Sequence, residues 1–250
     1  MVDRSVLLRR YLCQQRELGM PDILTLRTPS GSEGDDAVGP VKEVAPGSEK
    51  QQASGVRERL LEYYLEVKNC THCPLSRSRK NMVFGGGKAG AEILIIGEAP
   101  GNREDIEGKP FVGRAGDLLT KMLESIGLDR ERDVFITNIL KCRPPENRNP
   151  SILEVAACMP VLKRQVEILS PSVILVLGRV AAESLFEAGL SLKLYRGKRM
   201  EFNRIPAFVT YHPAALLRNT SFKRGAWEDL QKFRNYLKEK GIYGSYSSGE

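Results

Sequence analysis

One stretch constrains the fold of this chain more than any other: the apolar run Glu92–Gly97 and the turn behind it. Its consecutive Ile and Leu residues are typical of a strand that is buried on both faces of a parallel sheet. The run ends at Gly97, and the next four residues, Glu98-Ala99-Pro100-Gly101, favour a tight turn. Open α/β sheets bind ligands where parallel strands end in such turns. An ordinary strand-to-turn junction has the same composition, so other positions must decide whether a site lies here.

Short apolar strands alternate with amphipathic helices along most of the chain. This alternation predicts an α/β fold, a three-layer sandwich in which helices flank a central four-stranded, mainly parallel sheet. Ser151 is the expected N-cap of one helix, where Glu154 would complete a capping box. The expected strands are residues 92–97, 134–138, 173–177 and 205–210, and the expected helices are residues 57–68, 114–126, 151–169, 178–188 and 225–240.

Composition divides the chain into three parts. Residues 28–55 are rich in Gly, Pro, Ser and charged residues, and their lack of large apolar side chains predicts a disordered linker. Residues 3–19 have the periodicity of a short helix, which is either an inert extension or a docking segment for a partner. We therefore expect an N-terminal extension and linker over residues 1–55, one folded domain over residues 56–242, and a flexible tail over residues 243–250.

The charge of the chain favours a polyanionic partner. The net charge is +7, and the basic excess lies beyond residue 55. A basic folded domain suits nucleic acid, although a soluble basic protein without such a partner would have the same composition. No apolar run approaches the roughly 20 residues of a membrane-spanning helix. The first residues lack the apolar region of a secretory signal, so we expect a soluble intracellular protein without membrane contact.

Four cysteines in the folded part indicate a metal centre. Cys70 and Cys73 form a C-x2-C pair, which can offer two thiolates to one centre from a single turn. Cys142 and Cys158 have 15 residues between them, so they join the first pair only if the intervening helix folds back. Three interpretations remain open: an iron–sulfur cluster, a structural zinc ion, or unrelated buried cysteines. The fifth cysteine, Cys13, is treated as an ordinary thiol.

Polar residues follow three of the predicted strands. Glu98 comes after the first strand, Asn138 closes the second and His212 follows the fourth, so all three are expected at one edge of a parallel sheet. Phe111 lies on a loop that leaves the same edge. An amide can read the edge of a base, an aromatic ring can stack on a base, and a histidine can donate to an oxygen that gains negative charge. Each residue alone also has an ordinary structural explanation, and only their joint placement indicates a site.

Five motifs in order, together with the four cysteines, resemble family 4 uracil-DNA glycosylases, which are the iron–sulfur type. The resemblance runs from about Leu60 to Leu237 and leaves out the first 55 residues. The motifs are Gly97-Glu98-Ala99-Pro100-Gly101, Gly108-Lys109-Pro110-Phe111-Val112-Gly113-Arg114-Ala115-Gly116, Ile136-Thr137-Asn138, Lys141-Cys142-Arg143-Pro144-Pro145-Glu146-Asn147-Arg148 and His212-Pro213-Ala214.

The resemblance implies a cofactor and a ligand set. Cys70, Cys73, Cys142 and Cys158 would hold a [4Fe–4S] cluster. The cluster would shape the DNA-binding loops and take no redox part in turnover.

The resemblance also implies how a flipped-out uracil would be held. Phe111 would stack on the base, Asn138 would bond its O4 and N3 edge, and His212 would donate to O2. Glu104 would lie at the C5 side of the base, where it would repel a thymine methyl group. The residues expected to line the pocket and supply backbone contacts are Glu98, Ala99 and Pro100.

Loops around the site would bind the DNA itself. Arg143, Arg148 and Arg218 would hold phosphates. Leu216 and Leu217 follow the histidine motif and are candidates for the wedge that fills the vacated stack.

The chain departs from the wider superfamily at the position that often positions water. Many relatives have Asp or Asn where this chain has Ala99, so the water activator is one of Glu98, Glu104 and Asp105, or none is needed. Residues 114–133 contain no histidine that could bond to an abasic sugar, and no lysine is placed for Schiff-base chemistry. We therefore expect a monofunctional enzyme with His212, Asn138 and Glu98 as its catalytic residues.

The resulting hypothesis is a uracil-DNA glycosylase that leaves an abasic site and so initiates base excision repair. We expect it to act as a monomer on single- or double-stranded DNA, in the cytoplasm and associated with the nucleoid. Two alternatives stay open. One is a non-catalytic iron–sulfur module that binds deaminated or single-stranded DNA, and the other is a nucleotide-binding domain related by fold alone.

Overall fold

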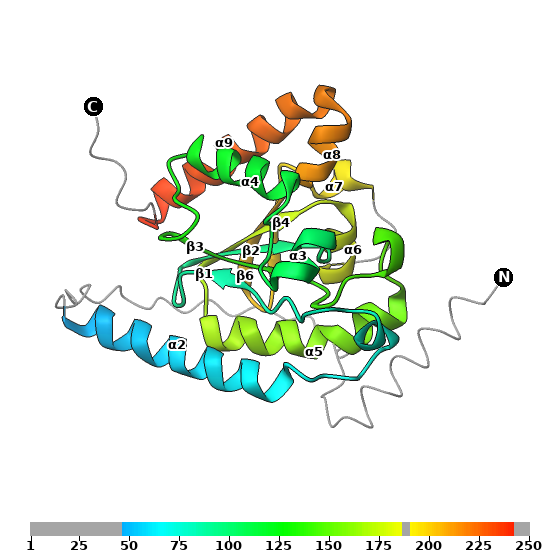
Figure 1. Ribbon diagram of the computed structural model, residues 1–250. Coiled ribbons are helices and arrows are strands. Elements are labelled where there is room, and N and C mark those ends of the chain that lie inside the picture. Colours follow the sequence, from blue (N-terminus) through cyan, green and yellow to red (C-terminus); the bar gives the residue numbers. More distant parts are fainter. Residues whose placement is uncertain (1–46, 187–190, 243–250) are drawn as a thin grey trace, which may run out of the picture. The chain divides into compact units, whose positions relative to one another are not determined.

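The computed structural model describes residues 47–186 and 191–242 (Figure 1). The predictions made for residues 1–46 and for the tail 243–250 lie outside the described residues. Within the described part, no helix is both long and apolar enough to cross a membrane.

The core of the fold is a mixed sheet with the strand order β1-β3-β2-β4-β6-β5. The four inner strands pair in parallel, as predicted, whereas β1 and β5 pair antiparallel at the two ends. The strands are β1 (Gly86–Gly87), β2 (Ile93–Gly97), β3 (Val134–Asn138), β4 (Val173–Leu177), β5 (Arg199–Phe202) and β6 (Ile205–Thr210).

The prediction of four strands was therefore wrong, and the sheet has six in the described part of the chain. Both missed strands lie at the ends of the sheet. β1 consists of two glycines, which have no side chains to produce a pattern, and β5 is only four residues long, with the charged, exposed Arg199 and Glu201 alternating with Met200 and Phe202. Neither strand has the apolar run that marks a strand covered on both faces.

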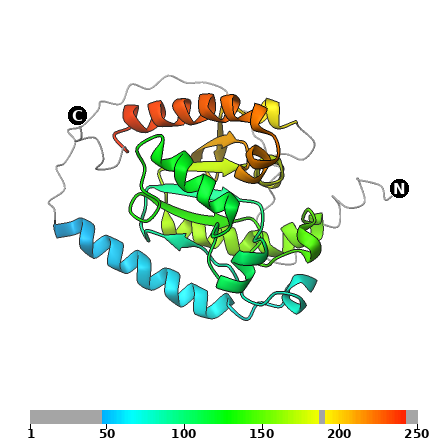
Figure 2. The same cartoon turned by 45° about the horizontal axis from the view of Figure 1, so that its top comes forward.

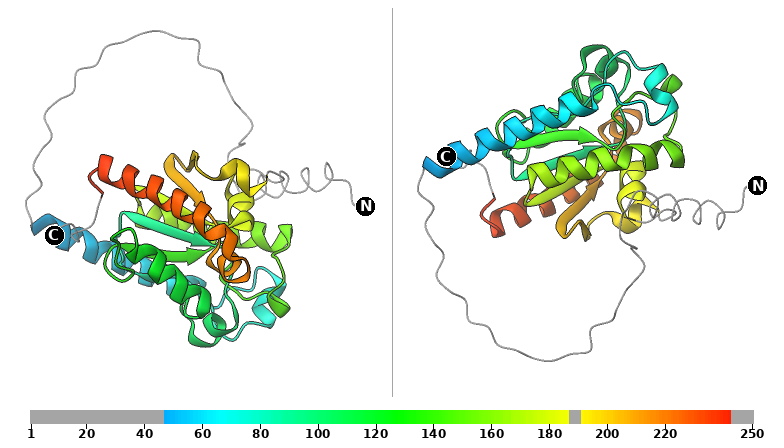
Figure 3. Two further views of the ribbon diagram at one scale, coloured as in Figure 1. Left: turned by 90° about the horizontal axis from the view of Figure 1, so that it is seen from above. Right: turned by 90° about the horizontal axis from the view of Figure 1, so that it is seen from below.

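Helices cover both faces of the sheet, which confirms the three-layer α/β fold (Figures 1 and 2). Leu94 and Ile96 of β2 pack with α2 and α5, whereas Ile93 and Ile95 point to the other face and pack with α4 and α9. The views from above and below show the same division (Figure 3). The helices are α2 (Gly47–Val67), α3 (Asn102–Glu107), α4 (Arg114–Glu124), α5 (Ile152–Leu169), α6 (Arg179–Leu185), α7 (Leu192–Tyr195), α8 (Pro213–Arg218) and α9 (Lys223–Glu239).

Two helix starts test the sequence patterns. The predicted capping box of α5 is confirmed, because the Ser151 side chain accepts from the Glu154 N–H and the Glu154 carboxylate accepts from the Ser151 N–H. By contrast, α2 begins at Gly47 rather than at Arg57, so it includes residues assigned to the linker. The start of this helix has few apolar residues, so its helical periodicity could not be seen there.

The parallel strands bring the predicted polar residues to one edge of the sheet. Gly97 at the end of β2 lies opposite Asn138 at the end of β3, and Leu177 at the end of β4 lies opposite Thr210 at the end of β6. The loops that follow these strands lead into Glu98 and His212. We call this the carboxyl edge of the sheet.

Candidate active site at the carboxyl edge

Asn138 and Phe111 meet above Gly97. A Cβ atom built on Gly97 would lie 2.7 Å from Phe111 Cζ and closer still to Asn138 Oδ1. The amide and the ring therefore occupy the space that any side chain at position 97 would need. This close approach explains why the buried strand β2 ends in glycine.

Asn138 presents an unsatisfied polar atom. Its side chain is 1 % exposed, and its Oδ1 is buried with no hydrogen-bond partner among the described residues. Buried polar atoms are nearly always paired, so an orphaned acceptor needs an explanation. The backbone of the residue is fixed from below, because Lys141 Nζ donates to the Asn138 carbonyl (2.6 Å) and to Thr137 Oγ1 (2.7 Å). The amide is thus held in place with an acceptor left open for a ligand.

Phe111 is held in an unfavourable backbone conformation, with φ at 52°. Arg130 fixes it by donating from Nη1 to the Phe111 carbonyl (2.7 Å) and from Nη2 to the Pro110 carbonyl (2.6 Å). Glu104 Oε1 accepts from the backbone N–H groups of Val112 and Gly113, each at 3.0 Å. A cation on the carbonyls and an anion on the N–H groups therefore clamp the loop from both sides, which offsets a strain on the order of 1–3 kcal/mol. We call Arg130 and Glu104 the loop clamp.

His212 stands beside the Phe111 ring, with the ring centroids 5.6 Å apart. It is the N-cap of α8, and its Nδ1 accepts from the Ala214 backbone N–H at 3.2 Å. Because Nδ1 accepts, the proton of the neutral ring resides on Nε2, which is left to donate. Gly178, with φ at 91°, makes room for this residue, since a Cβ there would lie 2.8 Å from the His212 Cβ.

The imidazole of His212 is neutral at physiological pH. Burial and the nearby Arg218 charge lower the pKa of His212 to about 4, and the Glu104 carboxylate opposes this shift. The site therefore offers a neutral N–H donor rather than an imidazolium ion.

Glu98 follows β2 and is half-buried, like Ala99, whereas Pro100 is buried. Burial raises the pKa of Glu98, and the charges of Arg179 and Arg218 oppose this rise. The other two carboxylates considered for water activation are already engaged. Glu104 holds the Phe111 loop, and Asp105 accepts from the Lys80 N–H at 2.9 Å.

Two of the predicted DNA contacts have other roles in the structure. Leu216 is 2 % exposed and packs in the core, so it cannot act as a wedge, whereas Leu217 is 41 % exposed. Arg148 makes a bidentate pair with the Glu154 carboxylate at 2.8 and 2.6 Å. This pair lowers the pKa of Glu154 to about 2 and engages the guanidinium that was predicted to bind phosphate.

The remaining predicted DNA contacts are accessible to different degrees. Arg143 is half-buried and joins two segments, because it donates to Asn147 Oδ1 (2.8 Å) and to Asn102 Oδ1 (2.7 Å). Arg218 is exposed at the end of α8, close enough to influence both Glu98 and His212.

Sequence reasoning missed the residues that hold the strand ends in place. Arg130 is 19 residues from Phe111, and no motif joins the two. At the end of β6, Arg196 donates to the Asp229 carboxylate (2.6 Å) and to the Tyr211 hydroxyl (2.7 Å), while Thr210 donates to the same carboxylate (3.0 Å). Arg130 and Arg196 are half-buried in the structure, and no pattern in the sequence marks an arginine of this kind.

The four cysteines share one region, and Cys142 lies four residues beyond the end of β3. Burial raises the pKa of Cys142, and the Cys70 and Cys73 charges add to this rise. Burial likewise raises the pKa of Cys158 to about 11, with contributions from Cys142 and Cys73. The four thiols are therefore close enough to interact electrostatically. Among the described residues, however, no three Cys, His, Asp or Glu side chains are placed to hold a metal ion.

Two cations adjoin these thiols. Arg79 Nη1 lies 3.1 Å from Cys142 Sγ, and the ammonium of Lys141 is close enough for its charge to oppose the pKa rise of Cys158. Burial lowers the pKa of the Lys141 ammonium to about 7, and negative charge on Cys158 and Cys142 would oppose this shift. Cysteine thiolates bound to iron would supply that negative charge, so the residues present fit an iron–sulfur group.

A family model for the uracil DNA glycosylase superfamily matches residues 84–231. The chain belongs to this superfamily. The matched range contains Glu98, Phe111, Asn138 and His212, but it begins after Cys70 and Cys73.

Named relatives place the chain within the superfamily more closely. A type-4 uracil-DNA glycosylase of Saccharolobus solfataricus is 47 % identical over 201 residues, which is 74 % of this chain and 92 % of the relative. The type-4 enzyme of Thermotoga maritima is 44 % identical over 191 residues, covering 74 % of this chain and 98 % of the relative. A type-5 uracil-DNA glycosylase of Pyrobaculum aerophilum is 29 % identical over 153 residues, covering 54 % and 66 % respectively. The similarity to type-4 members agrees with the family resemblance seen in the sequence.

Proposed function

We propose that this chain is a monofunctional uracil-DNA glycosylase, which hydrolyses the N-glycosidic bond of uracil in DNA and so initiates base excision repair. The names of its type-4 relatives support this proposal. One observation supports it most strongly: the unpaired Asn138 Oδ1 lies against Phe111, whose ring neighbours the imidazole of His212.

The side chains suit an everted uracil. The Phe111 ring would stack on the base. The Asn138 Oδ1 would accept from N3–H, and the amide Nδ2 would donate to O4. Cytosine has an amino group where uracil has O4 and a bare nitrogen at N3, so it would leave this amide unpaired. A buried unpaired group costs about 1–3 kcal/mol, which gives the amide its discriminating power.

His212 would assist departure of the base. Breaking the glycosidic bond places negative charge on uracil O2. The His212 Nε2–H would donate to this oxygen and strengthen that bond as the charge grows, which stabilises the transition state more than the ground state. A neutral donor keeps its own proton and needs no change of protonation during the reaction.

Water addition would involve Glu98. Ala99 has no polar side chain, and the carboxylates of Glu104 and Asp105 hold backbone N–H groups. Glu98 is the remaining candidate of the three, and it lies at the end of β2 beside the site. We propose that Glu98 orients the water that attacks the sugar.

We further propose that Cys70, Cys73, Cys142 and Cys158 hold a [4Fe–4S] cluster. When bound, the cluster supplies a structural cross-link and no step of the hydrolysis. Each iron of such a cluster would take one cysteine, which matches the number of thiols in this region. Thiols that influence the pKa values of one another support one shared centre for the four cysteines. Arg79 and Lys141 would balance the negative charge of the ligands.

The proposed enzyme would act as a monomer, since one chain supplies Asn138, Phe111 and His212. Its domain would comprise the predicted residues 56–242 together with the earlier start of α2. A repair enzyme of this kind would work at the nucleoid in the cytoplasm.

Excision from a labelled oligonucleotide that contains one uracil tests the function. Iron-loaded protein should produce alkali-sensitive strand breaks, and an identical oligonucleotide with thymine should stay intact. Asn138→Asp should lose preference for uracil over cytosine, because a carboxylate cannot both donate and accept as the amide does. Specific binding without strand breaks would instead favour a non-catalytic iron–sulfur module, and unchanged base preference in Asn138→Asp would remove the readout role.

A further inference from the structure

A basic cavity of about 810 Å³ lies next to the proposed site and has no role in the mechanism above. It is formed by the end of α2, the segment that leads into β1, and the end of α3 with the following loop. The residues that line it are Tyr64, Lys68, Asn69, Ser76, Arg79, Lys80, Asn81, Met82, Phe84, Gly85, Glu107, Gly108 and Lys109.

This cavity is at the carboxyl edge, on the β1 side of the uracil pocket. β1 runs antiparallel to β3, so Phe84 and Gly85 lie beside the end of β3. The Phe84 carbonyl accepts from Thr137 Oγ1 at 2.9 Å, and Thr137 is the residue before Asn138. On the other wall, Lys109 is two residues before Phe111. The cavity therefore adjoins the loop that carries the stacking ring.

The charge of the cavity is strongly positive. Lys68, Lys80 and Lys109 are exposed, and none of the three forms an ion pair within the described part of the chain. Arg79 also lines the cavity, but its guanidinium is engaged by Cys142 Sγ (3.1 Å) and the Lys68 carbonyl (3.2 Å). The single carboxylate of the lining, Glu107, pairs with Arg103 at 3.4 Å. Unpaired ammonium groups around a hollow attract a phosphate.

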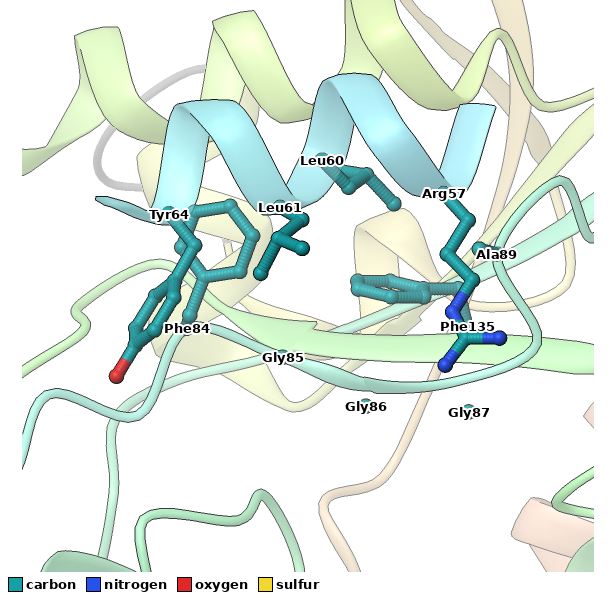
Figure 4. Close-up of a pocket in the computed structure, with 10 residues that line it drawn as sticks. All are labelled: Arg57, Leu60, Leu61, Tyr64, Phe84, Gly85, Gly86, Gly87, Ala89 and Phe135. Atoms are coloured by element: carbon teal, nitrogen blue, oxygen red, sulfur yellow. The ribbon is translucent and has the colours of Figure 1, made fainter. Parts of the chain in front are cut away.

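A second cavity provides a comparison. It measures about 660 Å³ and lies between α2 and β1, where Leu60, Leu61 and Phe135 face three glycines and Arg57 is the single charged residue of the lining (Figure 4). It lacks the cluster of positive charge. A polyanion would therefore favour the basic cavity over this second one.

We propose that the basic cavity binds backbone phosphates of the DNA strand that flank the flipped nucleotide on the β1 side. Arg218 and Leu217 of α8 lie beyond the uracil pocket, at the β6 side of the same edge, so the strand would cross the site between the two. This inference rests on the proposed function. The proposal assigns the phosphate contacts to lysines that form no ion pair within the described part of the chain. Arg148 was expected to make such contacts, but its guanidinium is bound to Glu154.

The test measures DNA binding as a function of salt for Lys68→Ala, Lys80→Ala, Lys109→Ala and the triple variant. Removal of a lysine that contacts a phosphate should make the negative slope of log K against log salt shallower by about 0.7–0.9. The losses should be similar for all DNA sequences and should fall on KM rather than on kcat. The matched control is Lys88→Ala, because Lys88 is also exposed but adjoins Val134 at the opposite edge of the sheet. Equal iron content and thermal midpoints would exclude misfolding as the cause.

The outcomes separate this inference from the proposed function. If the slopes of the cavity variants match those of Lys88→Ala and the wild type, the basic cavity does not bind phosphate, even where uracil is excised normally. If the slopes fall but the wild type excises nothing, the phosphate site stands and the glycosylase function fails. A change in the Lys88→Ala slope as large as in the cavity variants would also overturn the inference, since the effect would then be one of net charge alone.

Discussion

The carboxyl edge and the cysteine region hold their functional groups in different ways. At the edge, protein groups alone fix each side chain: Arg130 and Glu104 clamp the loop of Phe111, and Ala214 N–H orients His212. In the cysteine region, burial and mutual repulsion raise the pKa values of Cys142 and Cys158, so the thiols resist ionisation on their own. Protein groups hold the first region, whereas the proposed iron–sulfur cluster would hold the thiolates of the second.

This difference predicts how substitutions in the two regions should affect activity and stability. A change at the edge should remove activity and leave the fold intact, because the polar groups there face a ligand rather than the core. A change among the cysteines should act first on iron content and stability, and on activity only as a consequence.

Removal of the His212 donor should have the largest effect on rate. His212→Ala is expected to lower the single-turnover rate about 10²–10³-fold, the usual effect of losing one donor to a developing anion. His212→Ser should lose a similar factor yet remain as stable as the wild type, since a serine can still cap α8. A small loss of rate in both variants would show that leaving-group stabilisation lies elsewhere.

The pH dependence of the excision rate and of the stability tests whether His212 acts as a neutral donor. With a pKa of about 4, His212 should give no inflection in rate near its ordinary value of 6.5. The unfolded chain binds a proton at this residue between pH 6.5 and 4 and the folded chain does not, so stability should fall as the pH drops through this window. His212→Ala should show a weaker fall in the thermal midpoint over that range. A rate inflection near pH 6.5 that disappears in His212→Ala would contradict the neutral donor.

Loss of a cysteine should act through the metal. Cys142→Ser is expected to lower iron content and to reduce the free energy of unfolding by on the order of 4 kcal/mol, since loss of a metal is among the most damaging single changes. Iron analysis, visible absorbance and thermal denaturation measure these effects. Cys13→Ser, which changes a thiol outside the proposed ligand set, should alter none of them. Full iron content in Cys142→Ser would remove this residue from the ligand set.

The loop clamp should have the smallest effect. Arg130→Met leaves the Pro110 and Phe111 carbonyls without their donor, which costs about 1–3 kcal/mol. If the lost hydrogen bonds allow the Phe111 ring to move from its stacking position, the excision rate should fall by about tenfold. Arg132→Met is the matched control, because Arg132 is exposed and two residues away. Partial rescue by Arg130→Lys is expected, since an ammonium still donates but cannot span both carbonyls. An unchanged rate in Arg130→Met would mean that the loop holds without the clamp.

The sequence predicted those features that depend on the order of strands. Buried apolar runs identified the four parallel strands, and a parallel sheet necessarily gathers their ends, so Asn138 and His212 could be assigned to one edge. It could not predict contacts between segments that share no pattern. Arg130 reaches a loop 19 residues away, and Arg148 binds Glu154, where a free guanidinium was expected. Nor could a pair of adjacent leucines reveal that Leu216 faces the core and Leu217 the solvent, because that depends on the rotation of α8.

The segment from Asn138 to Cys142 is short. Its first residue is the proposed reader of the base, and its last is a proposed iron ligand. Lys141, within this span, donates back to the Asn138 carbonyl, which fixes the length of chain between the amide and the sulfur. An insertion or deletion here would displace either the proposed base reader or the proposed iron ligand. Substitutions can therefore accumulate on the surrounding surface, but this five-residue span has one permitted length.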